Sequence, residues 1–197
     1  MLNIREAFDA FTAEILPAVV KTYGERDTIA INEAWNDYTD SLTKDGELND
    51  LQYHYCPAFD DSIPHDWDDE REMILDAMDV KFTCVQVPSR PDHDEWLPGS
   101  RHWQFTITRG EEVISGHFSQ GSAITTDPDI QSVFHAILSD ADGTDEPFED
   151  WAENLGFDTD SRKAERAYNQ CKATAEALER MFSDISLDDL RELFSDY

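Results

Sequence analysis

The chain has 197 residues, and its 44 Asp and Glu against 15 Lys and Arg give a formal net charge of −29. Hydrophobic residues make up 40% of the chain and aromatic residues 11%, enough to form a buried core, so the charge does not imply disorder. The composition argues against a protein that binds nucleic acid directly, and against one that binds an anionic membrane surface, because both need a surplus of Lys and Arg on one face.

The chain carries no sequence signal for a membrane or for export. No apolar run approaches the roughly 20 residues of a spanning helix, and the first residues, Met1 to Glu6, lack the basic start and apolar stretch of a signal peptide. We therefore expect a cytoplasmic protein. Cys56, Cys84 and Cys171 are too scattered for a disulfide framework or a metal-binding pair, so we expect reduced thiols. The histidines form no closely spaced ligand pair, and residues 138–149 lack the first ligand of a calcium-binding loop, so we expect no metal and no cofactor.

Helical periodicity dominates the N-terminal part of the chain. Three helices are predicted there, over residues 4–23 with a kink at Pro17, over residues 28–44 and over residues 65–78. Either Asp27 or Thr28 can cap the second helix. Residues 47–59 fit a short helix and a loop equally well.

Strand periodicity replaces helical periodicity at residue 80. Alternating side chains predict strands over residues 80–87, 103–108 and 113–118, and Arg109-Gly110-Glu111 forms a tight turn between the last two. The result is a three-stranded antiparallel meander. Its first connection is long and carries Asp92, Asp94 and Glu95.

Helices return after residue 121. Asp127-Pro128 and Glu146-Pro147 each place an acidic residue before proline, which is typical of a helix start. A long helix is predicted from about Asp160 to Phe182, and Ser186 caps a final short one. The sequence therefore predicts an α+β fold with N-terminal helices (residues 1–79), an antiparallel β-meander (80–121) and C-terminal helices (122–197), forming one compact domain or two closely packed ones.

The negative charge is spread through the chain, so we expect it to coat the folded surface. Two clusters of acidic residues and the long loop are candidate partner-binding surfaces. A plainer interpretation also fits each cluster: the first can be an acidic first turn of a helix, and the second a solvated helix face. The candidate contacts are Asp66, Asp68, Asp69 and Glu70 in the first cluster, Asp92, Asp94 and Glu95 in the loop, and Glu149, Asp150 and Glu153 in the second cluster. Because B-form DNA carries one charge per about 1.7 Å, this protein's charge corresponds to roughly 50 Å of duplex.

Catalytic motifs give little support to an enzyme. The chain has no nucleophile elbow, zinc-protease motif or phosphate-binding loop. The nearest pattern is Asp79-Val80-Lys81 with acidic residues upstream, which resembles part of a metal-dependent nuclease site. Such an enzyme would need a basic groove for its substrate, so we expect no catalytic residues.

Two blocks of the sequence carry a resemblance to known proteins. The C-terminal block contains Phe148-Glu149-Asp150-Trp151 and the run from Asp158 to Glu165, and the N-terminal block covers residues 11–46. Both blocks resemble small acidic accessory proteins of phages and mobile elements. The resemblance implies a setting in which anti-CRISPR and antirestriction functions are frequent. It transfers no binding residue to this chain, and residues 60–121 match least.

Charge and resemblance together predict an anti-defence inhibitor whose acidic, DNA-mimicking surface blocks a nucleic-acid-binding groove of a host defence complex. A CRISPR effector is the first candidate partner and a restriction enzyme the second, in the host-cell cytoplasm. The alternatives are an inhibitor that recognises its target by shape, through the meander and aromatics such as Trp96; an acidic housekeeping or halophilic domain; and a metal-dependent nuclease.

Overall fold

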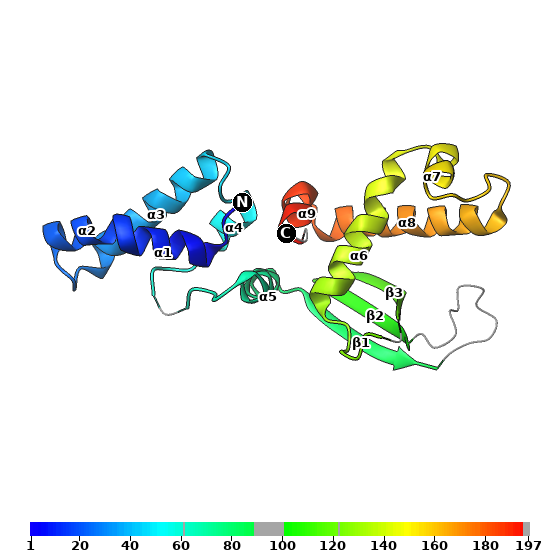
Figure 1. The fold of residues 1–197 in the computed structure, drawn as a ribbon, viewed down its shortest axis with the longest axis horizontal. Coiled ribbons are helices and arrows are strands. Elements are labelled where there is room, and N and C mark those ends of the chain that lie inside the picture. Colours follow the sequence, from blue (N-terminus) through cyan, green and yellow to red (C-terminus); the bar gives the residue numbers. More distant parts are fainter. Residues whose placement is uncertain (61, 89–100, 122, 195–197) are drawn as a thin grey trace. The chain divides into compact units, whose positions relative to one another are not determined.

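A computed structural model describes residues 1–60, 62–88, 101–121 and 123–194. Helices stand at both ends of the chain and a three-stranded antiparallel sheet lies between them in sequence, which confirms the predicted α+β class (Figure 1). The chain divides into two compact units, Met1–Met78 and Asp79–Tyr197. The meander and the C-terminal helices therefore belong to one unit.

The N-terminal unit consists of helices. They are α1 (Ile4–Glu14), α2 (Leu16–Tyr23), α3 (Thr28–Lys44), α4 (Asp50–His54) and α5 (Trp67–Ala77). The single helix predicted over residues 4–23 is two helices, because α1 ends at Glu14 and Pro17 occupies the second position of α2, where its missing N–H breaks no hydrogen bond. Asp27 caps α3, since its side chain accepts from the backbone N–H of Ala30 at 3.0 Å.

An aromatic cluster forms the core of this unit. Trp35 of α3 is fully buried and contacts Phe11 of α1 edge to face, with ring centroids 5.3 Å apart. Phe59, from the chain that follows α4, stacks on Phe8 at 4.5 Å. The indole N–H of Trp35 donates to the carbonyl of Pro57 at 3.0 Å, so the polar atom of the buried ring is satisfied.

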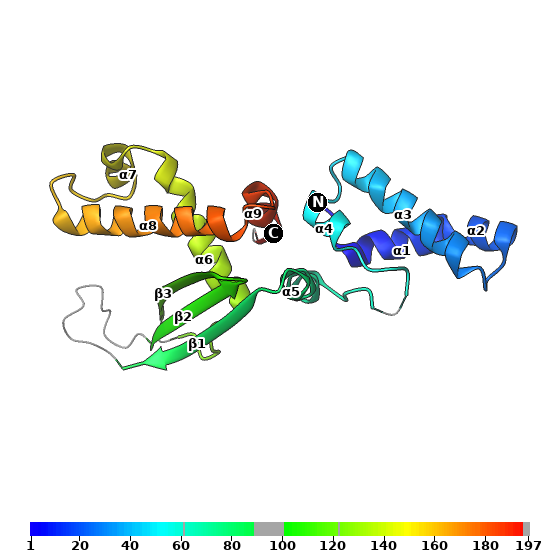
Figure 2. The same ribbon diagram turned by 180° about the vertical axis from the view of Figure 1, so that it is seen from behind.

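The C-terminal unit packs helices on a small sheet. Its elements are β1 (Lys81–Val87), β2 (Arg101–Arg109), β3 (Glu112–Gln120), α6 (Ile130–Asp142), the 3₁₀ turn η1 (Gly143–Asp145), α7 (Phe148–Asn154), α8 (Arg162–Met181) and α9 (Leu187–Phe194). The strand order is β1-β2-β3, and a two-residue turn joins β2 to β3 with Gly110 at a φ of 58°. Figures 1 and 2 show α6 crossing both the sheet and α8.

The strand register places the apolar side chains on one face of the sheet. Phe82, Ile107 and Ile114 lie side by side across the three strands, and Phe105 pairs with Gly116 in the next inward-facing row. A Cβ at Gly116 would lie 2.7 Å from Cζ of Phe105, so glycine makes room for the phenyl ring. On the helical side the Phe134 ring of α6 stacks on Phe194 of α9, with centroids 5.0 Å apart.

The start of α6 differs from the prediction. Asp129, and not Asp127, is the N-cap, and its side chain accepts from the backbone N–H of Ser132 at 2.7 Å. Asp127 instead pairs with Arg101, with a guanidinium nitrogen 2.6 Å from Oδ1. Among the described residues no helix is long and apolar enough to cross a membrane.

Candidate acidic interaction surface

The first acidic cluster lies at the N-terminus of α5, where Asp66 caps the helix. It is the N-cap, and its Oδ1 accepts from the backbone N–H groups of Asp68 and Asp69, both at 3.0 Å. The carboxylates of Asp68 and Asp69 are exposed in the first turn, where the helix dipole favours negative charge. Asp68 also pairs with Arg71, at 3.4 Å.

Two further acids extend this cluster along the helix. Glu72 and Asp76 are exposed and follow Asp68 at intervals of four residues. Since each residue turns an α-helix by about 100°, Asp68, Asp69, Glu72 and Asp76 fall within a sector of about 100°. We call these four residues the α5 acidic sector. The spacing by four identifies Glu72 and Asp76 from the sequence, whereas the density of acids in the first turn does not.

Glu70 is not part of this surface, so its predicted role as an exposed contact is wrong. Its side chain is fully buried, on the same side of α5 as Ile74. Glu70 Oε2 accepts from the backbone N–H of Ile4 at 2.6 Å, and Oε1 accepts from Nε2 of Gln52 at 2.6 Å. The carboxyl group therefore joins the start of α1 to α4 and α5 inside the N-terminal unit.

Burial raises the pKa of Glu70 to about 7. The hydrogen bonds from Gln52 and Ile4 act in the opposite direction, because they stabilise the ionised form, but loss of solvation outweighs them. Gln52 is itself held in place: its Oε1 accepts from the backbone N–H of Asn49 at 2.8 Å, and its Nε2 also donates to the carbonyl of Leu2 at 2.9 Å. The buried network is closely connected and unavailable to a partner.

The second acidic cluster surrounds α7 in the C-terminal unit. Glu149, Asp150 and Glu153 are exposed, as predicted for a solvent-facing surface, while Trp151 of the same helix is buried. The Trp151 ring stacks on Phe157, with centroids 5.5 Å apart and planes inclined by 10°. This packing orients the short helix so that its carboxylates point outward.

The remaining predicted contacts lie outside the described residues. They are the loop acids Asp92, Asp94 and Glu95, together with Trp96, the aromatic residue of the alternative in which the target is recognised by shape. The α5 acidic sector and the α7 cluster belong to different units, so each is a separate candidate surface.

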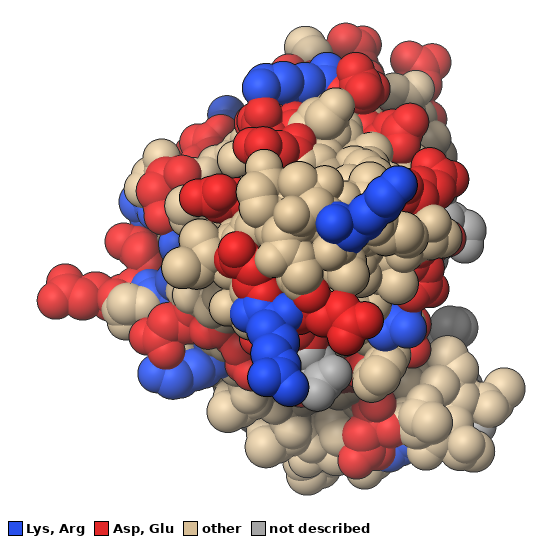
Figure 3. Space-filling model, turned by 90° about the vertical axis from the view of Figure 1, so that its left-hand side faces the viewer, with Lys and Arg blue, Asp and Glu red and all other residues tan. Residues whose placement is uncertain are grey.

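Acidic side chains are dispersed over the molecular surface. Figure 3 shows a face on which Asp and Glu groups outnumber Lys and Arg groups without forming one compact patch. Several arginines are paired with acids of the same chain, among them Arg101 with Asp127, and Arg109 with Asp184 at 2.8 Å. The hydrogen bond from Arg109 lowers the pKa of Asp184, and one from Ser62 lowers that of Asp60.

Nothing in the described part of the chain has the arrangement of a metal centre, since no group of three or more His, Cys, Asp or Glu side chains there could hold an ion. Asp79 and Lys81, the pair that suggested a nuclease, form an exposed ion pair at 3.0 Å. The cysteines are free, and burial raises the pKa of the Cys56 thiol to about 12, which keeps it protonated.

Comparison with protein-family models, with curated proteins and with solved structures finds no match to this chain. The interpretation of the acidic surfaces therefore depends on their geometry and charge.

Proposed function

We propose that this protein is a phage-type anti-defence inhibitor that presents an acidic, DNA-mimicking surface to the nucleic-acid-binding groove of a host defence complex. A CRISPR effector is the first candidate target and a restriction enzyme the second. The inhibitor works in the host-cell cytoplasm, binds no nucleic acid itself and catalyses no reaction. The observation that supports the proposal best is the α5 acidic sector, with its four carboxylates exposed on one side of a helix.

The spacing of these carboxylates suits a groove built for phosphates. Asp68, Glu72 and Asp76 repeat every four residues, or about every 6 Å along the helix axis. One strand of B-form DNA carries a charge per about 3.4 Å of axis, so the row has roughly half the charge density of a strand. Asp69, beside the row, raises that density. Lysines and arginines that hold alternate phosphates could pair with such a row.

The test measures how fast the tagged protein binds a purified CRISPR effector complex from a susceptible host, at ~0.05, ~0.15 and ~0.5 M salt. One variant neutralises the sector: Asp68→Asn, Asp69→Asn, Glu72→Gln and Asp76→Asn. It keeps the helix cap Asp66 and the buried Glu70. We expect the association rate constant to fall about tenfold at the lowest salt, because steering by exposed charges controls the rate of encounter.

A matched control neutralises four exposed acids elsewhere in the same unit. Its substitutions are Glu14→Gln, Glu25→Gln, Glu33→Gln and Asp37→Asn. Both variants change the net charge from −29 to −25, so a difference between them reports the position of the charges. Equal rates for the two variants would rule out the α5 acidic sector as the contact.

Competition distinguishes the proposal from its alternatives. A DNA mimic should be displaced by duplex DNA and released at ~0.5 M salt. Capture that persists at high salt and ignores DNA would instead indicate recognition by shape. If neither a CRISPR effector nor a restriction enzyme is captured and the protein folds only at high salt, the charge is an adaptation to a saline cytosol.

A further inference from the structure

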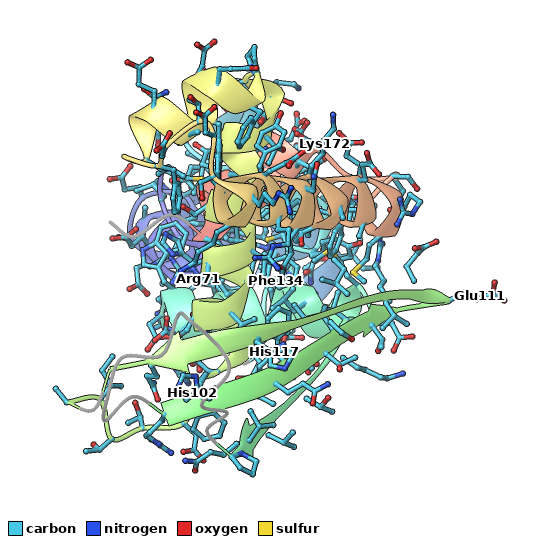
Figure 4. The ribbon with its side chains drawn as sticks, turned by 90° about the vertical axis from the view of Figure 1, so that its right-hand side faces the viewer. Arg71, His102, Glu111, His117, Phe134 and Lys172 are labelled. Atoms are coloured by element: carbon cyan, nitrogen blue, oxygen red, sulfur yellow. The ribbon has the colours of Figure 1, made fainter. Side chains whose placement is uncertain are left out.

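A crevice of about 450 Å³ lies between α8 and β3 in the C-terminal unit. Its floor is apolar and comes from the sheet and α6: Phe105, Ile114, Val133 and Ile137. This volume is in the range of sites that bind small molecules and peptide side chains. In Figure 4, His117 of β3 lies below α8, and Glu111 marks the far end of the hairpin.

The helical wall of the crevice is made of small or uncharged side chains. Ala167, Gln170, Thr174 and Ala177 are spaced by three and four residues, which places them on one side of α8. No residue of this wall is large enough to fill the space above the floor. The opening therefore follows from the choice of side chains on α8.

The charges beside the crevice are opposite in sign to the rest of the molecule. Lys163 and Arg166 are exposed and lie on the crevice side of α8 by helical geometry, whereas Glu165, Glu176 and Glu179 lie on another side of the helix. The one carboxylate of β3, Glu112, pairs with Arg180 at 3.6 Å. α8 itself carries 5 of the 15 Lys and Arg but only 3 of the 44 Asp and Glu.

We propose that this crevice binds a short segment of a partner protein, in which an apolar side chain is followed by one or two carboxylates. The apolar side chain enters the crevice between β3 and α8, over the buried side chains of Phe105 and Val133, and the carboxylates lie beside Lys163 and Arg166. Charge complementarity selects this occupant, because a basic segment would be repelled here and attracted almost everywhere else on a protein of net charge −29. This site is separate from the acidic surfaces of the proposed function.

The experiment selects binders of the full-length protein from a random nonapeptide library and titrates the synthetic form of the most enriched peptide. We expect enriched sequences with an apolar residue one to three positions before Asp or Glu. The backbone amide signals of residues 113–117 should shift on binding. Arg166→Glu should weaken binding about tenfold, since it turns an attraction into a repulsion.

Two more variants complete the test. Lys172→Glu makes the same change of charge on another side of the helix, where Figure 4 places Lys172 above α8, and should alter the affinity less than twofold. Thr174→Trp fills the crevice and should abolish binding while leaving the thermal midpoint of unfolding within a few degrees of the original. Enrichment of basic peptides, an equal effect of Arg166→Glu and Lys172→Glu, or unchanged binding by Thr174→Trp would overturn the proposal. So would self-association that Thr174→Trp abolishes, because the occupant would then be a second copy.

Discussion

The buried carboxyl group of Glu70 makes the stability of the N-terminal unit depend on pH in a predictable direction. Its pKa of about 7 in the folded protein exceeds the ~4.3 of an exposed glutamate. The folded state therefore binds the proton more tightly than the unfolded state. As the pH rises between these two values, the free energy of unfolding falls, because only the folded state still has to release a proton from this group.

The expected size of the effect follows from the two pKa values. A difference of one in pKa corresponds to about 1.4 kcal/mol, so ionising Glu70 in the folded state lowers the free energy of unfolding by about 4 kcal/mol in total. About 2 kcal/mol of this falls between pH 5.5 and 8.5. Other carboxylates repel one another more at high pH and add to the trend, so the wild-type curve alone cannot assign it to Glu70.

The variant Glu70→Gln isolates this contribution, because glutamine does not titrate. Urea unfolding at pH 5.5 and 8.5, followed through the indole NMR signal of Trp35, reports the N-terminal unit. The decrease with pH should be about 2 kcal/mol smaller in Glu70→Gln than in the wild type, and Glu72→Gln, exposed on the same helix, should leave it unchanged. Equal pH slopes in wild type and Glu70→Gln would refute the reasoning, as would a wild-type unit that grows more stable toward pH 8.5.

Three further predictions concern packing, capping and thiol reactivity. Gly116→Ala places a methyl group against the Phe105 ring and should lower the free energy of unfolding of the C-terminal unit by about 1–3 kcal/mol; an unchanged urea midpoint would contradict the close packing. Asp129→Ala should lower the free energy of unfolding of the C-terminal unit by about 1 kcal/mol, and Asp127→Ala should lower it by less. A larger effect of Asp127→Ala would indicate that Asp127 is the N-cap of α6, as the sequence predicted. Iodoacetamide at pH 8.5 should modify Cys56 about a thousandfold more slowly in the folded protein than in urea, where the thiol pKa returns to ~8.5, and equal rates would show that the thiol is accessible.

Local patterns were sufficient to predict most elements of the fold. The residues that make α3 amphipathic, with Trp35 on its inner side, repeat at the spacing of a helix, and the strands around Phe105 alternate at the spacing of a sheet. These periods are properties of the backbone, so a single sequence displays them. The same reasoning failed at the start of α6, where Asp127 and Asp129 both precede helical sequence and only the path of the chain selects the cap.

The acidic surface was harder to predict, because burial depends on partners that are distant in the chain. Glu70 lies three residues after Trp67 and four before Ile74, a spacing that could have marked it as facing inward. Its partners Gln52 and the backbone of Ile4 lie 18 and 66 residues away, and no local pattern connects them. A count of acids finds the cluster, but only the packed structure separates the exposed carboxylates from the buried one.

The uneven placement of charge constrains any account of how this protein works. α8 holds 5 bases against 3 acids, whereas the rest of the chain holds 10 bases against 41 acids. Adaptation to salt alone would favour acids at all exposed positions, including the exposed sides of α8. A basic helix beside an apolar crevice, in a protein of net charge −29, is instead what a second and oppositely charged contact requires. The α7 cluster and α8 belong to one unit, so a partner that contacts both with a basic and an acidic segment would bind more tightly than through either contact alone.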